Sequence, residues 1–440
     1  MKRSLLAVVG GTFTLRFSTG LTGGLLLYYL ASLGDLPGGR PVGAFEVGLL
    51  TALYFVAELV LSPAFGVLSD RVGTHPIMQL GPIFGAVAVV MTALTTDLFL
   101  LGVTRGIEGA AAAASIPSIL GYIAVATAGS EVLRGKAAAR FEGATLAGIG
   151  AGFAVAPLLF AALGPTAFFL NAVVYGVSFL IYRFGVEDRD AAERAAAHAG
   201  ESGQGRRIDW TRYGRVLRSS HVWLLAPTWI AVNASIGLWF SQSLFQFSRI
   251  DPRFPEQALH RGFHPMQISI AAVVVGVVFG AGLLYWGNRF RNMRRTTIIL
   301  YGIGGGAVLA IGGVVVNHGA GLAVIVSLAG LLAMAFGLFI LAGATPAALG
   351  LLADMSERFP SDRGAIMGLY SVFLALGQIV GSLIGGVAAD RYGIDGLLIA
   401  TFALLALALG PLALLRRQEH QLGFDDPEHG PAPAAGETGS

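Results

Sequence analysis

Long apolar stretches alternate with short polar turns along almost the whole chain. A helix needs about 20 mostly apolar residues to cross a membrane, so this pattern predicts an all-helical membrane protein. The longest polar interruption, residues 186–221, follows the sixth predicted span and divides the spans into two sets of six. The twelve predicted spans lie near residues 5–33, 44–66, 76–96, 98–126, 141–163, 166–185, 222–247, 266–286, 297–316, 320–348, 365–388 and 395–415.

The domain prediction follows this division. Residues 1–185 are expected to form an N-terminal six-helix bundle, and residues 222–415 a C-terminal one. Residues 186–221 form the linker between them. Residues 416–440 form a tail rich in Pro, Ala and Gly toward its end, a composition typical of disorder. The first span is too long for the apolar core of a signal peptide and is interpreted as a retained helix.

Composition supports a membrane protein and narrows its chemistry. Hydrophobic residues make up 55% of the chain and charged residues only 12%, far below the roughly 25% of soluble proteins. The absence of cysteine excludes disulfides, thiolate metal sites and cysteine nucleophiles. The sequence has no metal-ligand spacing and no phosphate-binding loop. We therefore expect no enzyme activity, no metal, no cofactor, no nucleic-acid partner and no direct ATP drive.

The basic residues predict how the chain crosses the membrane. With a cytoplasmic N-terminus, the inner loops and ends hold 22 of the 29 basic residues, the outer loops hold five, and two lie inside spans. Because Lys and Arg accumulate in cytoplasmic loops, both termini and the 186–221 linker are predicted to be cytoplasmic.

The two halves repeat each other at a constant offset of 229 residues. Glycine is common in this chain, but the same ungapped register also pairs a proline and an Arg-Gly dipeptide. It equates spans 4–6 with spans 10–12 as a parallel repeat. The matched positions are Pro117 with Pro346, Gly121 with Gly350, Arg134-Gly135 with Arg363-Gly364, Gly148 with Gly377, Gly152 with Gly381, and Gly164 with Gly393.

A short charged turn between spans 2 and 3 carries a family resemblance. Its pattern, Gly66-x-x-x-Asp70-Arg71-x-Gly73, resembles the loop between helices 2 and 3 of the major facilitator superfamily. The resemblance implies a gating motif in which Asp70 latches the start of span 11 near Gly364, where helix amides favour an anion. A near copy at 386–393 falls outside the repeat register and on the predicted outer side.

Two further motifs add to the resemblance. Arg105-Gly-Ile-Glu-Gly109 resembles the span-4 motif of this superfamily, whose Arg is tied to proton coupling. Gly148-x-x-x-Gly152 followed by Ala156-Pro157 resembles the span-5 motif of its proton antiporters, with Ala where the family has Gly. These small-residue ladders, like Gly377-x-x-x-Gly381, also predict close helix packing whatever the transport direction.

Four ionisable residues fall deep in the first-half spans: Arg16, Glu58, Arg105 and Glu108. Charged groups in spans are costly against lipid, so these should face one another or a wet cavity. A carboxylate in such a place can change its protonation as the site opens to either side, and proton coupling needs that property. The alternative is a fixed ion-pair cluster that clamps the helices, and Arg105 and Glu108, three residues apart, can simply pair with each other.

Span 7 offers a candidate substrate wall. Ser235, Trp239 and Gln242 share one helix face, and Asn233 lies on a neighbouring stripe. In the family fold spans 1, 4, 7 and 10 line the cavity. The alternative is that Trp239 belongs to the outer interface, where such residues are common.

The resemblance implies the major facilitator fold: two pseudo-symmetric six-helix bundles that work by alternating access. The preferred function is proton-coupled efflux of a small hydrophobic or amphipathic compound by a monomer in a bacterial inner membrane. Glu58 or Glu108 would take the proton, with Arg16 and Arg105 tuning them. The alternatives are a proton symporter importing a metabolite or organic anion, and a non-transporting membrane sensor or scaffold.

Overall fold

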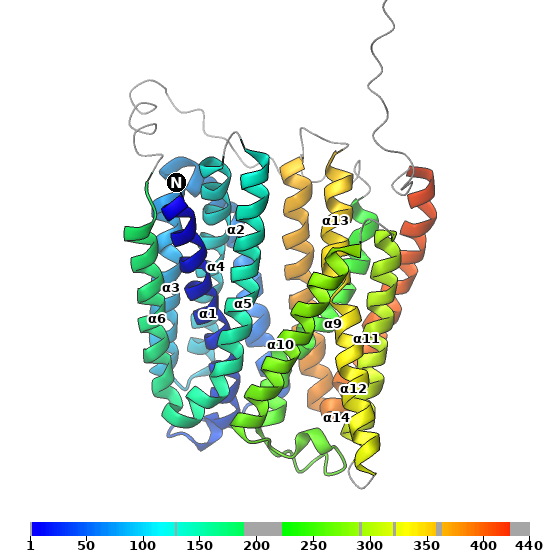
Figure 1. The fold of residues 1–440 in the computed structure, drawn as a ribbon. Coiled ribbons are helices and arrows are strands. Elements are labelled where there is room, and N and C mark those ends of the chain that lie inside the picture. Colours follow the sequence, from blue (N-terminus) through cyan, green and yellow to red (C-terminus); the bar gives the residue numbers. More distant parts are fainter. Residues whose placement is uncertain are drawn as a thin grey trace, which may run out of the picture.

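The computed structural model describes residues 2–127, 130–188, 222–289, 293–319, 323–357 and 363–422, and these residues are almost entirely helical (Figure 1). The first six helices are Lys2–Ser32 (α1), Ala44–Val72 (α2), Thr74–Ala93 (α3), Leu98–Ala126 (α4), Glu131–Leu163 (α5) and Ala167–Gly185 (α6). The others are Val222–Ser248 (α9), Pro265–Gly287 (α10), Arg295–Asn317 (α11), Val324–Leu341 (α12), Ala344–Glu357 (α13) and Arg363–Leu422 (α14). Most of the 186–221 linker and the tail beyond 422 lie outside the described residues.

The helices account for the predicted spans. Ten stretches of the described chain are long and apolar enough to cross a membrane. Two of these, Gly135–Gly185 and Leu369–Arg417, are each long enough for two crossings, and each contains a turn, at Gly164 and Gly393 respectively. Dividing them at these glycines gives twelve segments, in agreement with the predicted number. The tenth predicted span corresponds to α12 and α13 in succession.

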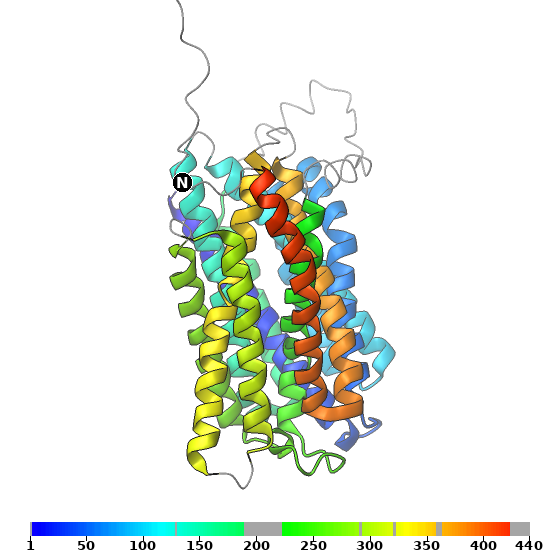
Figure 2. The ribbon, with the colours of Figure 1, turned by 90° about the vertical axis from the view of Figure 1, so that its right-hand side faces the viewer.

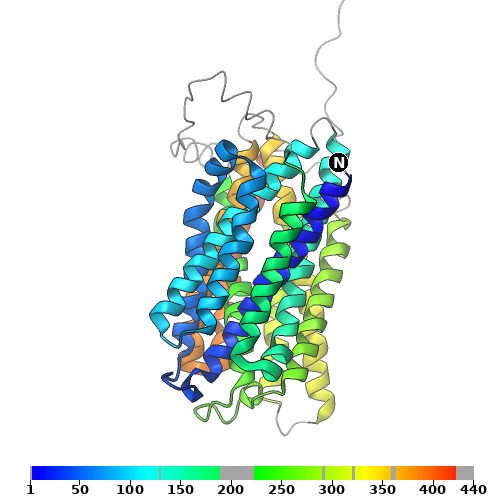
Figure 3. The same cartoon turned by 90° about the vertical axis from the view of Figure 1, so that its left-hand side faces the viewer.

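The two sets of helices lie side by side. In Figure 1, α1–α6 form one half and α9–α14 the other, and Figure 3 turns the first half toward the viewer. The N-terminus and the last turn of α14 lie at the same end of the molecule, called here the near end (Figures 1 and 2). The opposite end, with residues 33–43, 249–264 and the turns at Gly164 and Gly393, is called the far end. An even number of crossings requires this arrangement.

The sequence repeat is visible in the backbone at Gly164 and Gly393. Gly164 has φ 58° and ψ −142°, and Gly393, its partner at the 229-residue offset, has φ 59° and ψ −138°. Side chains rarely tolerate this region, which glycine enters freely. Each glycine therefore allows the chain to leave one helix and enter the next at the far end.

Matching glycines also bring matching helices together. A Cβ built on Gly148 of α5 would lie 2.9 Å from the Cβ of Arg16, and one on Gly152 would lie 2.6 Å from the amide N of Leu21, both on α1. In the second half, Gly377 and Gly381 of α14 lie equally close to Asn233 and Ala234 of α9. The α1–α5 contact of the first half thus recurs as the α9–α14 contact of the second. Pro157 lies inside α5, beyond this contact.

Candidate functional site

The charged residues of α4 lie inside the first half. Nη1 of Arg105 donates a hydrogen bond to Oε2 of Glu108, one helical turn away, and both side chains are buried. The Arg105 guanidinium also lies over the Tyr54 ring of α2, 4.8 Å from its centroid, a cation–π contact. Two polar atoms of the pair, Nε of Arg105 and Oε1 of Glu108, have no hydrogen-bond partner among the described residues. The sequence expectation that these two residues pair with each other agrees with this geometry.

A glycine contact brings α2 against this pair. A Cβ on Gly109 of α4 would lie 2.7 Å from the Cβ of Ala57 and 3.0 Å from the amide N of Glu58. Only glycine permits this approach, and it places Glu58 beside the turn of α4 that carries Glu108. Tyr54, one turn earlier on α2, lies within electrostatic range of Glu58, Arg16 and Arg105. The four predicted ionisable residues are therefore gathered in one region.

Arg16 interacts with charged residues of two other helices. Its guanidinium, on α1, is buried and interacts electrostatically with Glu58 of α2 and with Glu142 of α5. Among the described residues it forms no salt bridge within 4.0 Å. Arg16 thus interacts with carboxylates of two other helices and forms a close ion pair with neither.

Glu142 was not predicted as a site residue. The apolar pattern placed the start of this span at residue 141, which put Glu142 at the membrane surface. In the structure α5 begins at Glu131, so Glu142 lies about 16 Å along the helix. The side chain is exposed, yet it interacts with Arg16 of the first half and Tyr370 of the second. An exposed carboxylate within range of both halves lies between them. The helix start, ten residues before the apolar run, was the missing signal.

The charge balance changes with Glu142. We call Arg16, Glu58, Arg105, Glu108 and Glu142 the charged cluster. It holds two guanidiniums and three carboxylates, so it carries one excess negative charge when all five are ionised. The balanced pairs expected from sequence, two Arg with two Glu, describe only part of it.

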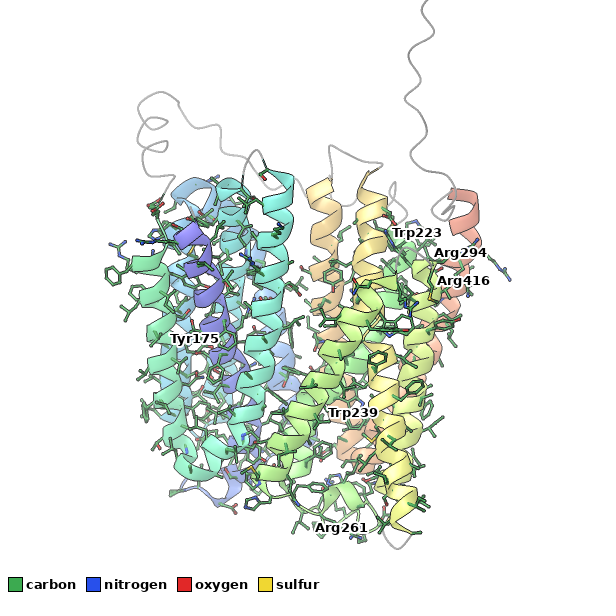
Figure 4. All side chains as sticks on the ribbon, viewed as in Figure 1. Tyr175, Trp223, Trp239, Arg261, Arg294 and Arg416 are labelled. Atoms are coloured by element: carbon green, nitrogen blue, oxygen red, sulfur yellow. The ribbon has the colours of Figure 1, made fainter. Side chains whose placement is uncertain are left out.

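The predicted substrate-wall residues on α9 form hydrogen bonds with different partners. Asn233 and Ser235 donate hydrogen bonds to their own helix, to the carbonyls of Trp229 (2.9 Å) and Val232 (2.7 Å). Nε1 of Trp239 donates to Oγ1 of Thr401 on α14 (2.9 Å), and Figure 4 places Trp239 toward the far end. These side chains are satisfied within the second half.

Gln242 reaches the other half instead. Its Nε2 donates to the carbonyl O of Ala44, the first residue of α2, at 2.9 Å, and its Oε1 accepts from Gln246 at 3.1 Å. Its side chain is fully buried. Gln242 therefore lies in a contact between the halves at the far end. Phe153 of α5 and Phe240 of α9 stack across the same boundary, 5.0 Å between ring centroids.

The predicted gating motif lies at the near end of α2. Gly66 is close to α4, where a Cβ would lie 4.0 Å from the Cβ of Pro117, while Asp70 and Arg71 are exposed. Gly73 ends α2 with φ 106°, and its N–H bonds the carbonyl of Ser69 at 2.9 Å. The side chains of residues 363–368, where the latch partner was expected, lie outside the described part, so the latch stays a prediction.

Two six-helix halves related by a repeat, with the Arg105–Glu108 pair and Arg16 buried deep in the helices of the first half, are the arrangement of a membrane transporter. The family model of the Major Facilitator Superfamily matches residues 8–341 and, in a second match, 252–437. The chain belongs to the major facilitator superfamily, as its motifs predicted.

Individual relatives agree with this assignment. The chain is 26% identical over 360 residues to multidrug resistance protein 2 of Bacillus subtilis, covering 78% of this chain and 80% of that protein. It is 29% identical over 124 residues to the quinolone resistance protein NorA of Staphylococcus aureus, a match covering 28% of this chain and 30% of NorA. The crystal structure of the nucleoside transporter NupG has the same fold, with a TM-score of 0.72 over 94% of this chain and 99% of NupG, at 12% identity.

Proposed function

We propose that this transporter exports small amphipathic compounds in exchange for protons. The near end would face the cytoplasm, because the loops and ends predicted there hold 22 of the 29 basic residues. Arg294 and Arg416 lie at that end, and Arg261 at the other (Figure 4). The names of two relatives, a multidrug resistance protein and a quinolone resistance protein, support the direction and the kind of compound.

The observation that carries the proposal is the excess carboxylate of the charged cluster. One proton would bring the cluster to neutrality, and the arrangement of Glu58 and Glu142 on either side of Arg16 offers two places for it. Burying an uncompensated charge is unfavourable, so closing the halves around the cluster favours the protonated form. Opening it to water favours release. A transporter that must be neutral to close couples its movement to proton binding.

The position of Glu142 would allow one side chain to interact with both the proton and the substrate. It lies within range of Tyr370 of α14, whose ring stacks on Trp229 of α9 with 5.5 Å between centroids. The partly exposed Tyr370 ring, supported from behind by the buried Trp229, gives an apolar surface beside a carboxylate, the combination that an amphipathic molecule requires. We therefore infer that Glu142 exchanges its proton against the substrate, while the Arg105–Glu108 pair holds the helices in place.

The test uses proteoliposomes with an imposed proton gradient and ethidium as a fluorescent amphipathic probe. We expect gradient-driven ethidium movement in the wild type and its loss in Glu142→Gln, because a permanently neutral side chain cannot exchange a proton. Ethidium counterflow without a gradient should persist in this variant. Glu256→Gln, which changes an exposed carboxylate in the far-end loop, is the matched control. Gradient-driven transport that survives in Glu58→Gln, Glu108→Gln and Glu142→Gln would refute coupling through the cluster.

Arg16 supports one other candidate. A buried guanidinium with no close salt bridge among the described residues can attract an anion. Uptake of an organic anion together with a proton would then replace export. The same liposomes distinguish the two when a fluorescent organic anion replaces ethidium as the probe. Symport moves that anion and the proton in one direction, whereas antiport moves ethidium and the proton in opposite directions.

A further inference from the structure

The near copy of the gating motif, Gly386-Val-Ala-Ala-Asp390-Arg391-Tyr-Gly393, lies where the two halves touch. This segment ends the first part of α14 at the far end, and it faces the first turns of α2 in the other half. The repeat register gave it no counterpart and no role. Its contacts with α2 hold the two halves together at the far end.

Two glycines allow the closest approach. A Cβ on Gly386 would lie 3.0 Å from both the carbonyl O of Ala44 and the Cα of Phe45, on α2. A Cβ on Gly48 would lie 3.2 Å from the Cα of Gly386 and would overlap the carbonyl O of Ser382. The two backbones are therefore in contact without side chains between them. Gln242, bonded to the carbonyl of Ala44, closes the same place from α9.

Asp390 adds a charge to this contact. Its Oδ1 lies 3.2 Å from a Cβ built on Gly43, the residue that caps the start of α2. The start of a helix carries a partial positive charge, so a carboxylate there is favourable. The N–H of Gly43 itself donates to Oε2 of Glu46 at 2.9 Å, and Glu46 pairs with Arg40, so the part of Asp390 in this contact is electrostatic. Nη1 of Arg253, in the far-end loop, donates to the carbonyl O of Asp390 at 3.2 Å and helps to hold this turn.

Both copies of the motif involve α2 and α14, but the helix that carries the motif and the helix that it meets are exchanged between them. Asp70 belongs to the copy at the end of α2 and is expected to meet the start of α14 at the near end. Asp390 holds the same place in the copy on α14 and lies at the start of α2 at the far end. The geometry points to a far-end latch, made by Gly386, Asp390, Gly43 and Gly48, that keeps the far end closed while the near end is open.

The latch does not depend on what the protein carries or on proton coupling, so it is tested by distances alone. The chain has no cysteine, so spin labels can be placed without background. Leu94→Cys at the end of α3 and Val324→Cys at the start of α12 put one label on each half at the far end, at positions 71% and 85% exposed and outside the latch. Pulsed electron paramagnetic resonance on the labelled protein in lipid nanodiscs then measures the far-end separation.

Asp390→Asn removes the charge with little change in shape. We expect the ratio of far-end-open to far-end-closed molecules to rise roughly two- to fivefold, the factor set by one charge at a helix start. Gly48→Ala should raise it roughly five- to 150-fold, because its new methyl group overlaps the α14 backbone. Asp70→Asn should move the ratio the other way.

Two variants serve as controls. Arg391→Gln changes the adjacent exposed charge, and Gly410→Ala adds a methyl group on α14 where nothing lies within 4 Å. Both should leave the distance distribution unchanged. A distribution in Asp390→Asn that matches Arg391→Gln, or one in Gly48→Ala that matches Gly410→Ala, would overturn the latch.

Discussion

The paired turns at Gly164 and Gly393 allow a backbone cost and a packing cost to be measured separately. Both glycines have nearly the same φ and ψ, so alanine at either position strains the backbone alike, by about 1–3 kcal/mol. Their surroundings differ. A Cβ on Gly164 would meet nothing within 4 Å, whereas one on Gly393 would lie 2.6 Å from Oε1 of Gln257 and 2.7 Å from Nε2 of His260. Gly164→Ala therefore costs strain alone.

The additional cost at Gly393 follows from the bonds of Gln257. This buried side chain accepts from the amide of Ile394 (2.8 Å) and donates to the carbonyl of Tyr392 (2.9 Å) and to Asp395 (3.2 Å). Moving Oε1 away from a new methyl group breaks at least the bond to Ile394 and leaves a buried amide unpaired, at about 1–3 kcal/mol. We expect Gly393→Ala to lower the free energy of unfolding by about 2–6 kcal/mol in all.

The assay is thermal denaturation in detergent, followed by size-exclusion chromatography of the surviving protein. Apparent melting temperatures should fall in the order wild type, Gly164→Ala, Gly393→Ala. Gly176→Ala, which adds a methyl group in open space at an ordinary helical position, should not lower the temperature. Equal losses at Gly164 and Gly393 would show that the far-end loop contributes nothing at this turn, and the reasoning from its contacts would be wrong.

Three further predictions rest on other contacts. Gly152→Val should abolish transport by forcing α5 from α1, whereas Gly150→Val, on the same helix with open space at its Cβ, should be tolerated; cell-surface level and uptake measure both. Asp70→Asn should slow ethidium transport without changing which compounds compete, and an unchanged rate would contradict the near-end latch. Burial lowers the pKa of His260 from 6.5 to about 4, so the far-end loop should lose up to roughly 3 kcal/mol of stability as pH falls from 6.5 to 4. Hydrogen exchange of the loop, corrected for intrinsic rate, should rise over that range in the wild type and not in His260→Phe.

The sign of the pH effect follows from where the proton binds. His260 is buried, and neither ring nitrogen has a hydrogen-bond partner in the part of the chain that the structure describes, so the folded loop holds the ring neutral. Between pH 6.5 and 4 the unfolded loop binds a proton that the folded loop does not, so the stability of the loop decreases as the pH is lowered. Asp251 does not act in this range, because the guanidinium of Arg253 lowers the pKa of that carboxyl to about 2. Exchange that is flat from pH 6.5 to 4 would contradict the burial argument.

Hydrophobic pattern was enough to predict the helices, since each crossing needs a long apolar run whatever its neighbours are. It was not enough for helix ends that extend beyond the bilayer. The first turns of α5 carry Glu131, Lys136 and Arg140, so the apolar criterion began the span too late and left Glu142 at the surface. A criterion based on apolar residues cannot detect the part of a helix that extends beyond the hydrocarbon core of the bilayer.

The contacts of α9 show a second limit. Helical spacing correctly puts Ser235, Trp239 and Gln242 on one face, but it does not say what that face meets. Trp239 bonds Thr401 within its own half, while Gln242, one turn on, bonds Ala44 of the other half. Partners of this kind come from residues more than 150 positions away, and only the packing of whole helices brings them together.

The repeat also shows one position at which the two halves differ in buried charge. Gly148 packs against the Cβ of Arg16, and Gly377, its partner at the 229-residue offset, packs against the Cβ of Asn233. Arg16 and Asn233 are therefore equivalent positions in the two halves. Arg16 faces carboxylates of two neighbouring helices, whereas the amide of Asn233 turns back to the carbonyl of Trp229 on its own helix.

This substitution of a neutral residue for a charged one changes what each half can do. At the Asn233 position the second half has no charge that must be compensated when the halves open or close. At the Arg16 position the first half carries a charge whose energy depends on its exposure to water, and a proton or a charged molecule can compensate it. Under the proposed function, the repeat would supply the movement, and the difference between Arg16 and Asn233 would supply the reason for coupling that movement to protons.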